Sequence, residues 1–188
     1  IDPFCCQVQW DQICANEATG MCTLPPLNDD CAFAAPIGVG STPFSTELAS
    51  GAIEIPASCD EGYGTTIFDD IYFTYVAEGT GVVTVSTCGT NDSTGFDTVL
   101  NAYSGFCGSF TSVGCNDDAN GECGGLDSGT RRDSYLQFSV TRNATYYIQL
   151  GGFNGTQGTG LLNFSITACS SPGNDLCANA AWIAANTP

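Results

Sequence analysis

Between Asn28 and Cys169 the chain consists of short runs of alternating apolar and polar residues, separated by clusters of Gly, Asn, Asp and Ser. Leu136, Phe138 and Val140 would share one face of a strand. Such runs predict strands at 71–77, 81–88, 97–105, 134–140, 145–152 and 160–168. The pattern favours an all-β fold, a two-sheet antiparallel β-sandwich of jelly-roll-like arrangement, and the Gly-rich connection 151–160 is long enough to cross between the sheets.

The first 27 residues differ from the rest of the chain. Val8, Ile13 and Ala18 recur at roughly helical spacing, and Gly20 can end a helix there. We expect a short helical element stapled by four cysteines, whose three pairings stay open, at Cys5, Cys6, Cys14 and Cys22. Consecutive prolines then mark a boundary. The predicted organisation is a cysteine-rich helical element at 1–27, a sandwich at 28–169 and a linker with a strand at 170–188.

A decapeptide repeats within the chain. NDDCAFAAPI at 28–37 recurs as NDLCANAAWI at 174–183, with seven of ten positions identical. Either the chain is a window of a longer tandem array, or its C-terminal segment is a strand offered to a neighbouring subunit. The second arrangement is head-to-tail and non-closing, and would produce a filament. The residues expected to make this assembly contact are Cys177, Ala180, Trp182 and Ile183.

Twelve cysteines and a single methionine predict an exported, oxidised protein at the cell surface or outside the cell. We predict bridges Cys107–Cys115, Cys31–Cys59 and Cys88–Cys123. Cys169 and Cys177 are then left to pair with each other or with a neighbouring copy. The spacings do not suit zinc, no apolar run is long enough to span a bilayer, and nothing at Ile1 looks like a signal peptide, so any such signal is expected to have been removed.

Twenty acidic residues stand against three basic ones, giving a formal net charge of −17. This charge would repel nucleic acid, and divalent cations would neutralise part of it. Calcium takes six to eight oxygen ligands, which acidic loop clusters supply. Two clusters are candidate calcium sites, with Asx turns and caps as the alternative explanation. Their members are Asn28, Asp29, Asp30, Asp69 and Asp70 in the first, and Asp97, Asn116, Asp117 and Asp118 in the second.

The chain contains no histidine and no lysine. This excludes Ser-His-Asp and Cys-His nucleophiles and lysine Schiff bases, and leaves only carboxylate chemistry, such as a glycosidase with paired acids. We expect no enzyme activity. Aromatic residues at 63, 68, 72, 73, 75, 103, 146 and 147 offer either a sugar-stacking platform or, as strand alternation favours, core packing. Arg131 and Arg132 are expected at a solvated loop tip.

Four Asn-X-Ser/Thr sequons make candidate glycosylation sites in a host with the necessary enzymes. Their alternative explanation is chance in an Asn- and Thr-rich chain. They are Asn91, Asn143, Asn154 and Asn163.

The segments FDDIYFTYVAEGTGVVTVSTC, FDTVLNAYSGFCGSFTSVGCNDDA and TYYIQLGGFNGTQGTG, together with the first decapeptide, make 28–169 resemble the bacterial pre-peptidase C-terminal domain in its cysteine-rich planctomycete-type form. The N-terminal DPFCCQVQWDQICANEATGMC resembles a small cysteine-rich element found between such domains. The resemblance implies a non-catalytic sandwich module of secreted hydrolases or surface proteins. It also implies calcium at Asn28, Asp29, Asp69 and Asp70, although the adjacency of the last two departs from the family's spacing.

Together these patterns predict an extracellular, non-catalytic structural or adhesive module of a tandem-repeat or filament-forming surface protein. Its expected partners are copies of itself, joined head to tail with calcium support. The alternative is an accessory module of a secreted hydrolase that binds polysaccharide or protein. An exposed aromatic row on one sheet face would favour that alternative.

Overall fold

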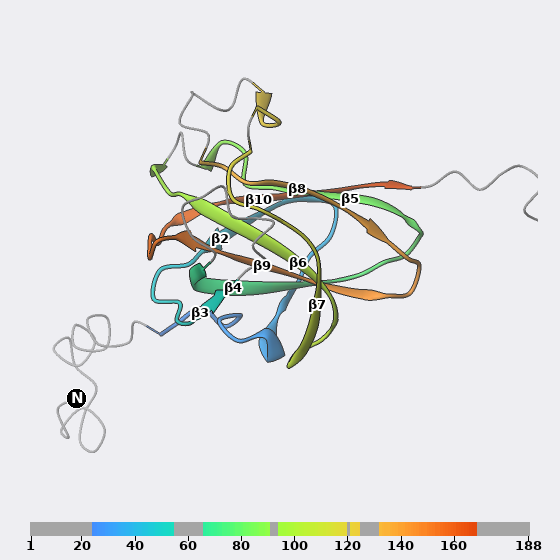
Figure 1. The fold of residues 1–188 in the computed structure, drawn as a ribbon, viewed down its shortest axis with the longest axis horizontal. Helices are drawn as coiled ribbons and strands as arrows, with labels where there is room; N and C mark the ends of the chain where they lie inside the picture. Colours follow the sequence, from blue (N-terminus) through green and yellow to red (C-terminus); the bar gives the residue numbers. More distant parts are fainter. Residues whose placement is uncertain (1–23, 55–65, 91–93, 120, 125–131, 169–188) are drawn as a thin grey trace, which may run out of the picture.

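The computed structural model describes residues 24–54, 66–90, 94–119, 121–124 and 132–168, which form two β-sheets (Figure 1). In order across it, the first sheet contains β1 (Ala35–Pro36), β4 (Thr66–Val76), β9 (Thr145–Phe153), β6 (Thr98–Phe106) and β7 (Ser109–Asn116), and β3 (Ala52–Glu54) also pairs with β4. The second sheet contains β2 (Gly40–Ser45), β10 (Thr159–Ala168), β5 (Gly81–Ser86) and β8 (Tyr135–Val140).

Neighbouring strands are antiparallel except for β1, which runs parallel to β4. The predicted all-β sandwich is confirmed, and all the predicted strands are present. The connection between β9 and β10 passes from the first sheet to the second, as its length predicts. The sequence analysis missed β1, β2, β3 and β7, which are short or interrupted by Pro and Gly.

The core lies between the two sheets and follows from strand alternation. Val83 and Val85 of β5 are fully buried, and Leu136 and Phe138 of β8 are 5% and 4% exposed. The facing sheet contributes inward side chains that belong to the same cluster, at Ile71, Phe73, Tyr75, Leu100, Ala102, Tyr146, Ile148 and Leu150. The predicted shared face of Leu136, Phe138 and Val140 in β8 is therefore confirmed.

The first decapeptide is part of this sandwich. Asp30 caps a short 3-10 helix, η1 (Cys31–Phe33), by accepting a hydrogen bond from the Ala32 N–H. The chain then continues into β1 beside β4. A disulfide joins Cys31 to Cys107, at the turn between β6 and β7. The segment is thus tied to the first sheet by a strand pairing and a covalent bridge, while the cap stabilises η1 locally.

The structure corrects two of the three predicted disulfides. Cys31 pairs with Cys107, so neither Cys31–Cys59 nor Cys107–Cys115 is right, while Cys88–Cys123 is confirmed. Cys115 is also disulfide-bonded. The wrong pairings joined cysteines close in sequence, whereas the η1 segment packs against the β6–β7 turn far along the chain. The predicted helical element and the cysteines at 5, 6, 14, 22, 59, 169 and 177 lie outside the described residues.

Candidate functional site

A buried aspartate, Asp70, lies at a bulge in β4. The pairing of β4 with β9 shifts register between Phe68 and Ile71, and Asp69 adopts a φ of 50°. The Asp69 N–H donates to the Gly51 carbonyl at 3.2 Å. Asp70 follows directly and lies beside Gln149 on the outer face of the first sheet, where the residue is only 2% exposed.

Asp70 ends a chain of side-chain hydrogen bonds that crosses the outer face of the first sheet. Ser112 Oγ donates to Asn101 Oδ1 at 2.8 Å, and Asn101 Nδ2 donates to Tyr103 Oη at 3.0 Å. Tyr103 Oη donates to Gln149 Oε1 at 2.6 Å, and Gln149 Nε2 donates to Asp70 Oδ2 at 2.9 Å. The chain links four strands and is satisfied at every step up to the carboxylate.

The other carboxylate oxygen of this aspartate, Asp70 Oδ1, is buried and receives no hydrogen bond. Burial raises the pKa of Asp70 above its ordinary range, hydrogen bonds from Gln149 and Tyr72 oppose the rise, and the charge of Asp29 adds to it. Burial also raises the pKa of Tyr103 to about 12. The unpaired oxygen of Asp70, which also experiences the negative charge of Asp29, is chemically suited to bind a cation.

The first predicted calcium cluster is brought together only in part. Asn28 Nδ2 donates to the Tyr72 carbonyl at 2.9 Å. Asp29 accepts from Ser50, at Oδ1 from N–H and at Oδ2 from Oγ. Asp30 caps η1 and lies beside two cysteines that form a disulfide and so cannot bind a metal as thiolates. The unpaired oxygen of Asp70 fits a cation, whereas Asp30 serves as a helix cap.

The second predicted cluster comes together around Asp97, at the start of β6. Carboxylate oxygens of Asp97, Asp117 and Asp118 lie within 4.8 Å of one another. Asn116 is used differently, because its Nδ2 donates to the Asp118 carbonyl and its Oδ1 accepts from the Tyr135 N–H. Both side-chain groups of Asn116 are therefore used in hydrogen bonds within the protein, while the three aspartates fit an oxygen-binding divalent cation.

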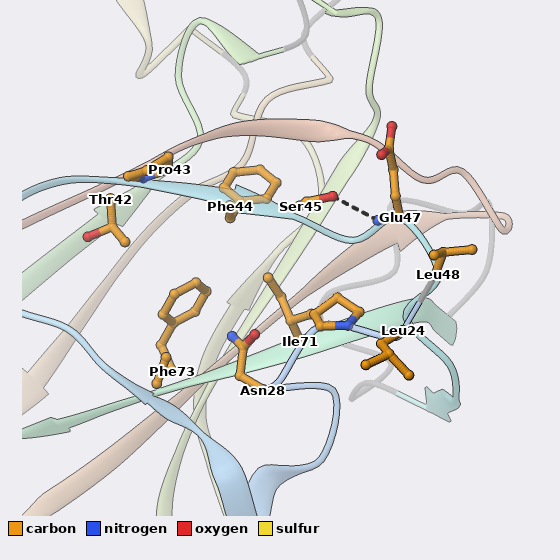
Figure 2. A pocket seen from close by; sticks show the side chains of 12 residues that line it. Leu24, Asn28, Thr42, Pro43, Phe44, Ser45, Glu47, Leu48, Ile71 and Phe73 are labelled. Carbon is orange, nitrogen blue, oxygen red and sulfur yellow. Dashed lines mark hydrogen bonds between the residues drawn. The ribbon is translucent and has the colours of Figure 1, made fainter. Parts of the chain in front are cut away.

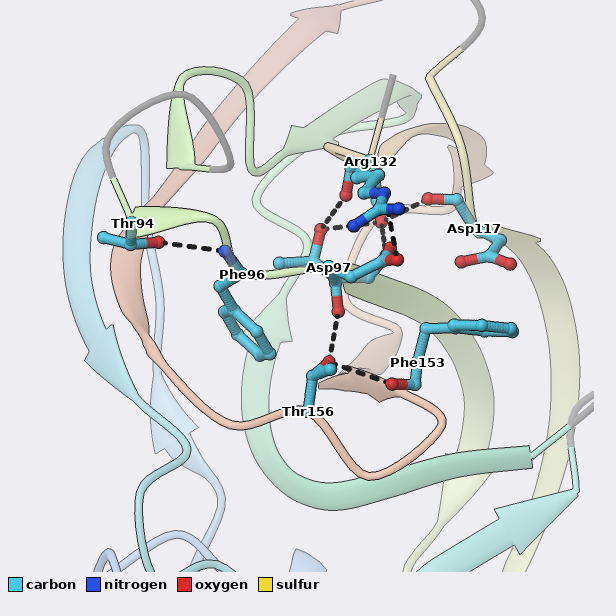
Figure 3. Close-up of polar contacts among 9 residues, drawn as sticks. Thr94, Phe96, Asp97, Asp117, Arg132, Phe153 and Thr156 are labelled. Atoms are coloured by element: carbon cyan, nitrogen blue, oxygen red, sulfur yellow. Dashed lines mark hydrogen bonds and ion pairs between the residues drawn. The ribbon is translucent and has the colours of Figure 1, made fainter. Parts of the chain in front are cut away.

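Arg132 lies against this cluster, with its Nε 3.6 Å from Asp97 Oδ2 (Figure 3). Burial raises the pKa of Asp97, and the guanidinium opposes the rise. Thr156 Oγ1 donates to the Asp97 carbonyl at 3.1 Å, which holds the β9–β10 turn against the site. Three carboxylates and one guanidinium leave an excess of negative charge that a divalent cation would compensate.

The sequence analysis did not single out Asp133. Its Oδ2 accepts from the Gly89 N–H at 2.8 Å, and the residue is 1% exposed. The sequence Arg-Arg-Asp does not predict the bond from Gly89, because an acidic residue just before a strand is usually exposed to solvent. Asp133 instead fastens the loop that carries Cys88.

The aromatic residues divide between two faces of the first sheet. Phe73, Tyr75 and Tyr146 belong to the core. Tyr72, Tyr103 and Tyr147 lie on the outer face around Phe110, with ring centroids 6.3, 4.7 and 5.0 Å from it. Because Tyr72 and Tyr103 are 4% and 7% exposed, this cluster is a small second core and not an open aromatic row.

A groove of about 490 Å³ opens along one side of the sandwich, between β2 and β4 (Figure 2). Phe44 lines it from β2, while Ile71 and Phe73 line it from β4. Leu24 and Asn28 border it from the segment that precedes η1. The groove thus runs between β2, the edge strand of the second sheet, and β4 of the first sheet.

Three sequons lie in the described residues. Asn143 and Asn154 are exposed in tight turns with φ values of 66° and 51°. Asn163 is half-buried in β10, where its Oδ1 accepts from Ser41 Oγ at 2.6 Å. The fourth, Asn91, lies outside the described residues, as do Arg131 and the predicted assembly residues at 177, 180, 182 and 183.

No family model and no curated protein matches this sequence. Among solved structures, the chain is similar to the pre-peptidase C-terminal domain of collagenase from Bacillus anthracis, at 11% identity and a TM-score of 0.41 over 70% of this chain and 94% of that one. It is also similar to CorA, a surface-associated copper-binding protein of Methylomicrobium album BG8, at 10% identity and a TM-score of 0.45 over 71% and 98%.

A third similar structure is Aeromonas hydrophila PliG, a periplasmic inhibitor of g-type lysozyme, at 18% identity and a TM-score of 0.37 over 71% of this chain and 96% of that one. These likenesses assign no function to this chain. The two-sheet architecture itself is consistent with the pre-peptidase C-terminal type of domain that the sequence resembles. Within the described residues, no helix has the length and hydrophobicity to cross a membrane.

Proposed function

We propose that this chain is an extracellular, non-catalytic structural or adhesive module whose copies follow one another head to tail. Residues 174–183 would take, in a neighbouring sandwich, the place that 28–37 take in this one. The observation that carries the proposal is that the residues fixing the first decapeptide to the sandwich recur in the second. Disulfide bonds among the described residues support an oxidising location.

Three residues of the first decapeptide make its main attachments. Asn28 forms two hydrogen bonds with Tyr72, one from its side chain and one accepted by its carbonyl from the Tyr72 N–H at 2.8 Å. Asp29 holds Ser50 through both carboxylate oxygens. Cys31 forms the bridge to Cys107.

The second decapeptide keeps the residue types that make these attachments in the first. Asn174, Asp175 and Cys177 stand where Asn28, Asp29 and Cys31 stand in the first copy, and the positions that differ include the η1 cap, which becomes Leu176. Residues 28–37 already occupy the place beside β4 in this chain, so the proposal assigns residues 174–183 to another sandwich. This supports a head-to-tail order of modules.

The proposal predicts that assembly depends on the shared residues. Full-length chain should form regular linear particles with one domain-sized repeat by negative-stain electron microscopy, and the Asn174→Ala/Cys177→Ser variant should be monomeric in sedimentation velocity. Asn179→Ala is the matched control, because this position differs between the copies and should leave the particles unchanged. Wild-type chain that is monomeric under every condition would remove the assembly proposal.

We also propose that calcium supports the fold at Asp70 with Asp29, and at Asp97 with Asp117 and Asp118. The unpaired Asp70 Oδ1 supports the first site and the clustered carboxylates support the second. Bound calcium would balance the negative charge of these buried and half-buried carboxylates. Extracellular calcium modules bind with dissociation constants of about 10⁻⁴–10⁻³ M.

Calcium at about ten to a hundred times the dissociation constant should stabilise the fold by about 1.4–2.7 kcal/mol, seen as a rise in Tm relative to a chelator. Asp70→Asn and Asp117→Asn should each lose part of this rise. Asp70→Asn should also be at least as stable as wild type in chelator, because it removes a buried charge. Glu47→Gln, an exposed acid outside both clusters, is the control. A Tm that does not change with calcium in wild type or in any of the variants would contradict the proposal.

A further inference from the structure

An exposed apolar surface lies where the described part of the chain begins. Apolar residues line a hollow of about 650 Å³ there, together with Asp29 and Asp30. We call these apolar residues the entry surface, and they are Leu24, Pro25, Pro26, Leu27, Phe33 and Ala34. Leu24, Leu27 and Phe33 are 77%, 93% and 71% exposed. Single exposed apolar residues are ordinary, whereas large ones that line one hollow mark a contact surface.

The entry surface is held in place by the backbone that carries it. Pro25 and Pro26 fix φ at two successive positions, and the Asp29 N–H donates to the Pro26 carbonyl at 3.0 Å. The η1 helix, which ends at Phe33, is joined by a disulfide to the turn between β6 and β7. Leu27 and Phe33 are therefore presented from fixed positions, so a contact that covers them costs little backbone entropy.

The apolar surface continues past Leu24 into the groove between β2 and β4. Leu24 and Pro26 line this groove as well, and Leu48 lies at the same end of it as Leu24 (Figure 2). Leu48 is 47% exposed and adopts a φ of 65°, a conformation that costs free energy for a residue with a bulky side chain. Large exposed apolar residues thus border two hollows that share Leu24 and Pro26.

Residues 1–23 join the entry surface directly at Leu24. They carry only three of the twenty acidic residues, and their large apolar residues are Ile1, Phe4, Val8, Trp10, Ile13 and Met21. A segment of this length is too short to bury these side chains in a core of its own. Because the segment is attached beside the hollow, docking there is intramolecular and needs only a weak contact. A second copy would instead bring together two chains of formal net charge −17.

We infer that residues 1–23 dock on the entry surface of their own sandwich and cover Leu27 and Phe33. The docked segment shields these side chains from water, and packing then fixes the segment against the sandwich in addition to the single chain connection at Leu24. The contact is made within one chain by uncharged side chains. It therefore depends neither on head-to-tail assembly nor on calcium.

Hydroxyl-radical labelling of the full-length wild-type chain tests whether the entry surface is covered. Phe33 and Phe106 are a matched pair, because they are 71% and 67% exposed on the sandwich and of the two only Phe33 lines the hollow. Docking predicts that Phe33 is labelled several-fold less than Phe106 at every protein concentration. Equal labelling would overturn the inference. Protection of Phe33 that is lost on dilution would assign the surface to a second copy, and would overturn it as well.

Tryptophan fluorescence tests the identity of the occupant. Trp10 is the only tryptophan left after Trp182→Phe, and docking should protect it from acrylamide in the folded protein. In that background Leu27→Asp/Phe33→Asp should lower the equilibrium constant for docking by about tenfold or more, because charges replace two apolar contacts. Acrylamide quenching of Trp10 should then rise toward that of the chain unfolded in urea and reductant.

The matched control is Val113→Asp/Leu161→Asp, which makes the same kind of change at exposed apolar positions of β7 and β10. Its Trp10 quenching should equal that of the Trp182→Phe protein, and circular dichroism should show both variants folded. Quenching that does not change with Leu27→Asp/Phe33→Asp would contradict the inference, as would an equal rise in the control. The labelling result needs no substitution and decides the matter where a variant does not fold.

Discussion

Removing the bridge between Cys31 and Cys107 should lower the free energy of unfolding by about 4 kcal/mol. The bridge closes a loop with a sequence separation of 76, and the chain-entropy model gives a loss of this size when such a loop is opened in the unfolded state. The double variant Cys31→Ser/Cys107→Ser avoids a free thiol. Urea unfolding, followed by far-ultraviolet circular dichroism, measures the change in the free energy of unfolding.

The comparison is Cys88→Ser/Cys123→Ser, whose loop has a sequence separation of only 35 and should cost somewhat less. The first variant should also free the decapeptide, so hydrogen exchange at the bonded amides of Ala32 and Ile37 should accelerate more than exchange in β9. An unfolding midpoint equal to that of wild type would show that the Cys31 bridge does not reduce the conformational entropy of the unfolded chain.

Replacing Gln149 with Leu should destabilise the protein by about 3–5 kcal/mol at neutral pH, because it leaves a buried carboxylate and a buried hydroxyl without their partner. Gln149 is fully buried between Tyr103 and Asp70, accepting from one and donating to the other. Denaturant unfolding measures the loss. Gln137→Leu on the exposed face of β8 is the matched control and should change stability by no more than about 0.5 kcal/mol.

The loss at Gln149 should depend on pH. Burial raises the folded-state pKa of Asp70, so its contribution to stability is fully present below the unfolded pKa and is lost as the pH rises through the folded value. The bond from Gln149 lowers that pKa, so the variant should have a still higher one and lose more stability on the same rise. The deficit of Gln149→Leu should thus be smaller in acid than at neutral pH. A deficit that is constant with pH would mean that Asp70 is not the group affected.

The sequence predicted the parts of the fold that depend on local periodicity. Leu136, Phe138 and Val140 alternate with polar residues over a whole strand, and such a run determines its own buried face. By contrast, β1 is two residues long and includes Pro36, so it has no period from which it could be recognised. Its place is set by the Cys31 bridge and by β4, which are distant in sequence.

The candidate sites show the same limit. Asp97, Asp117 and Asp118, which the sequence analysis did group, meet because β6 and β7 are adjacent antiparallel strands. The network behind Asp70 depends on a register shift and on a positive φ at Asp69, and neither has a signature in the residue pattern.

The Cys31–Cys107 bridge has a mechanical consequence for any row of such modules under tension. A pull that enters at the decapeptide and leaves at the end of β10 passes through the bridge, so the stretch between these two cysteines cannot extend. At about 3.3 Å per residue this withholds roughly 250 Å of chain. A module forced open would lengthen only through β7 and the strands that follow. The stretch between the two cysteines would stay closed by the bridge, with its ends held together during refolding.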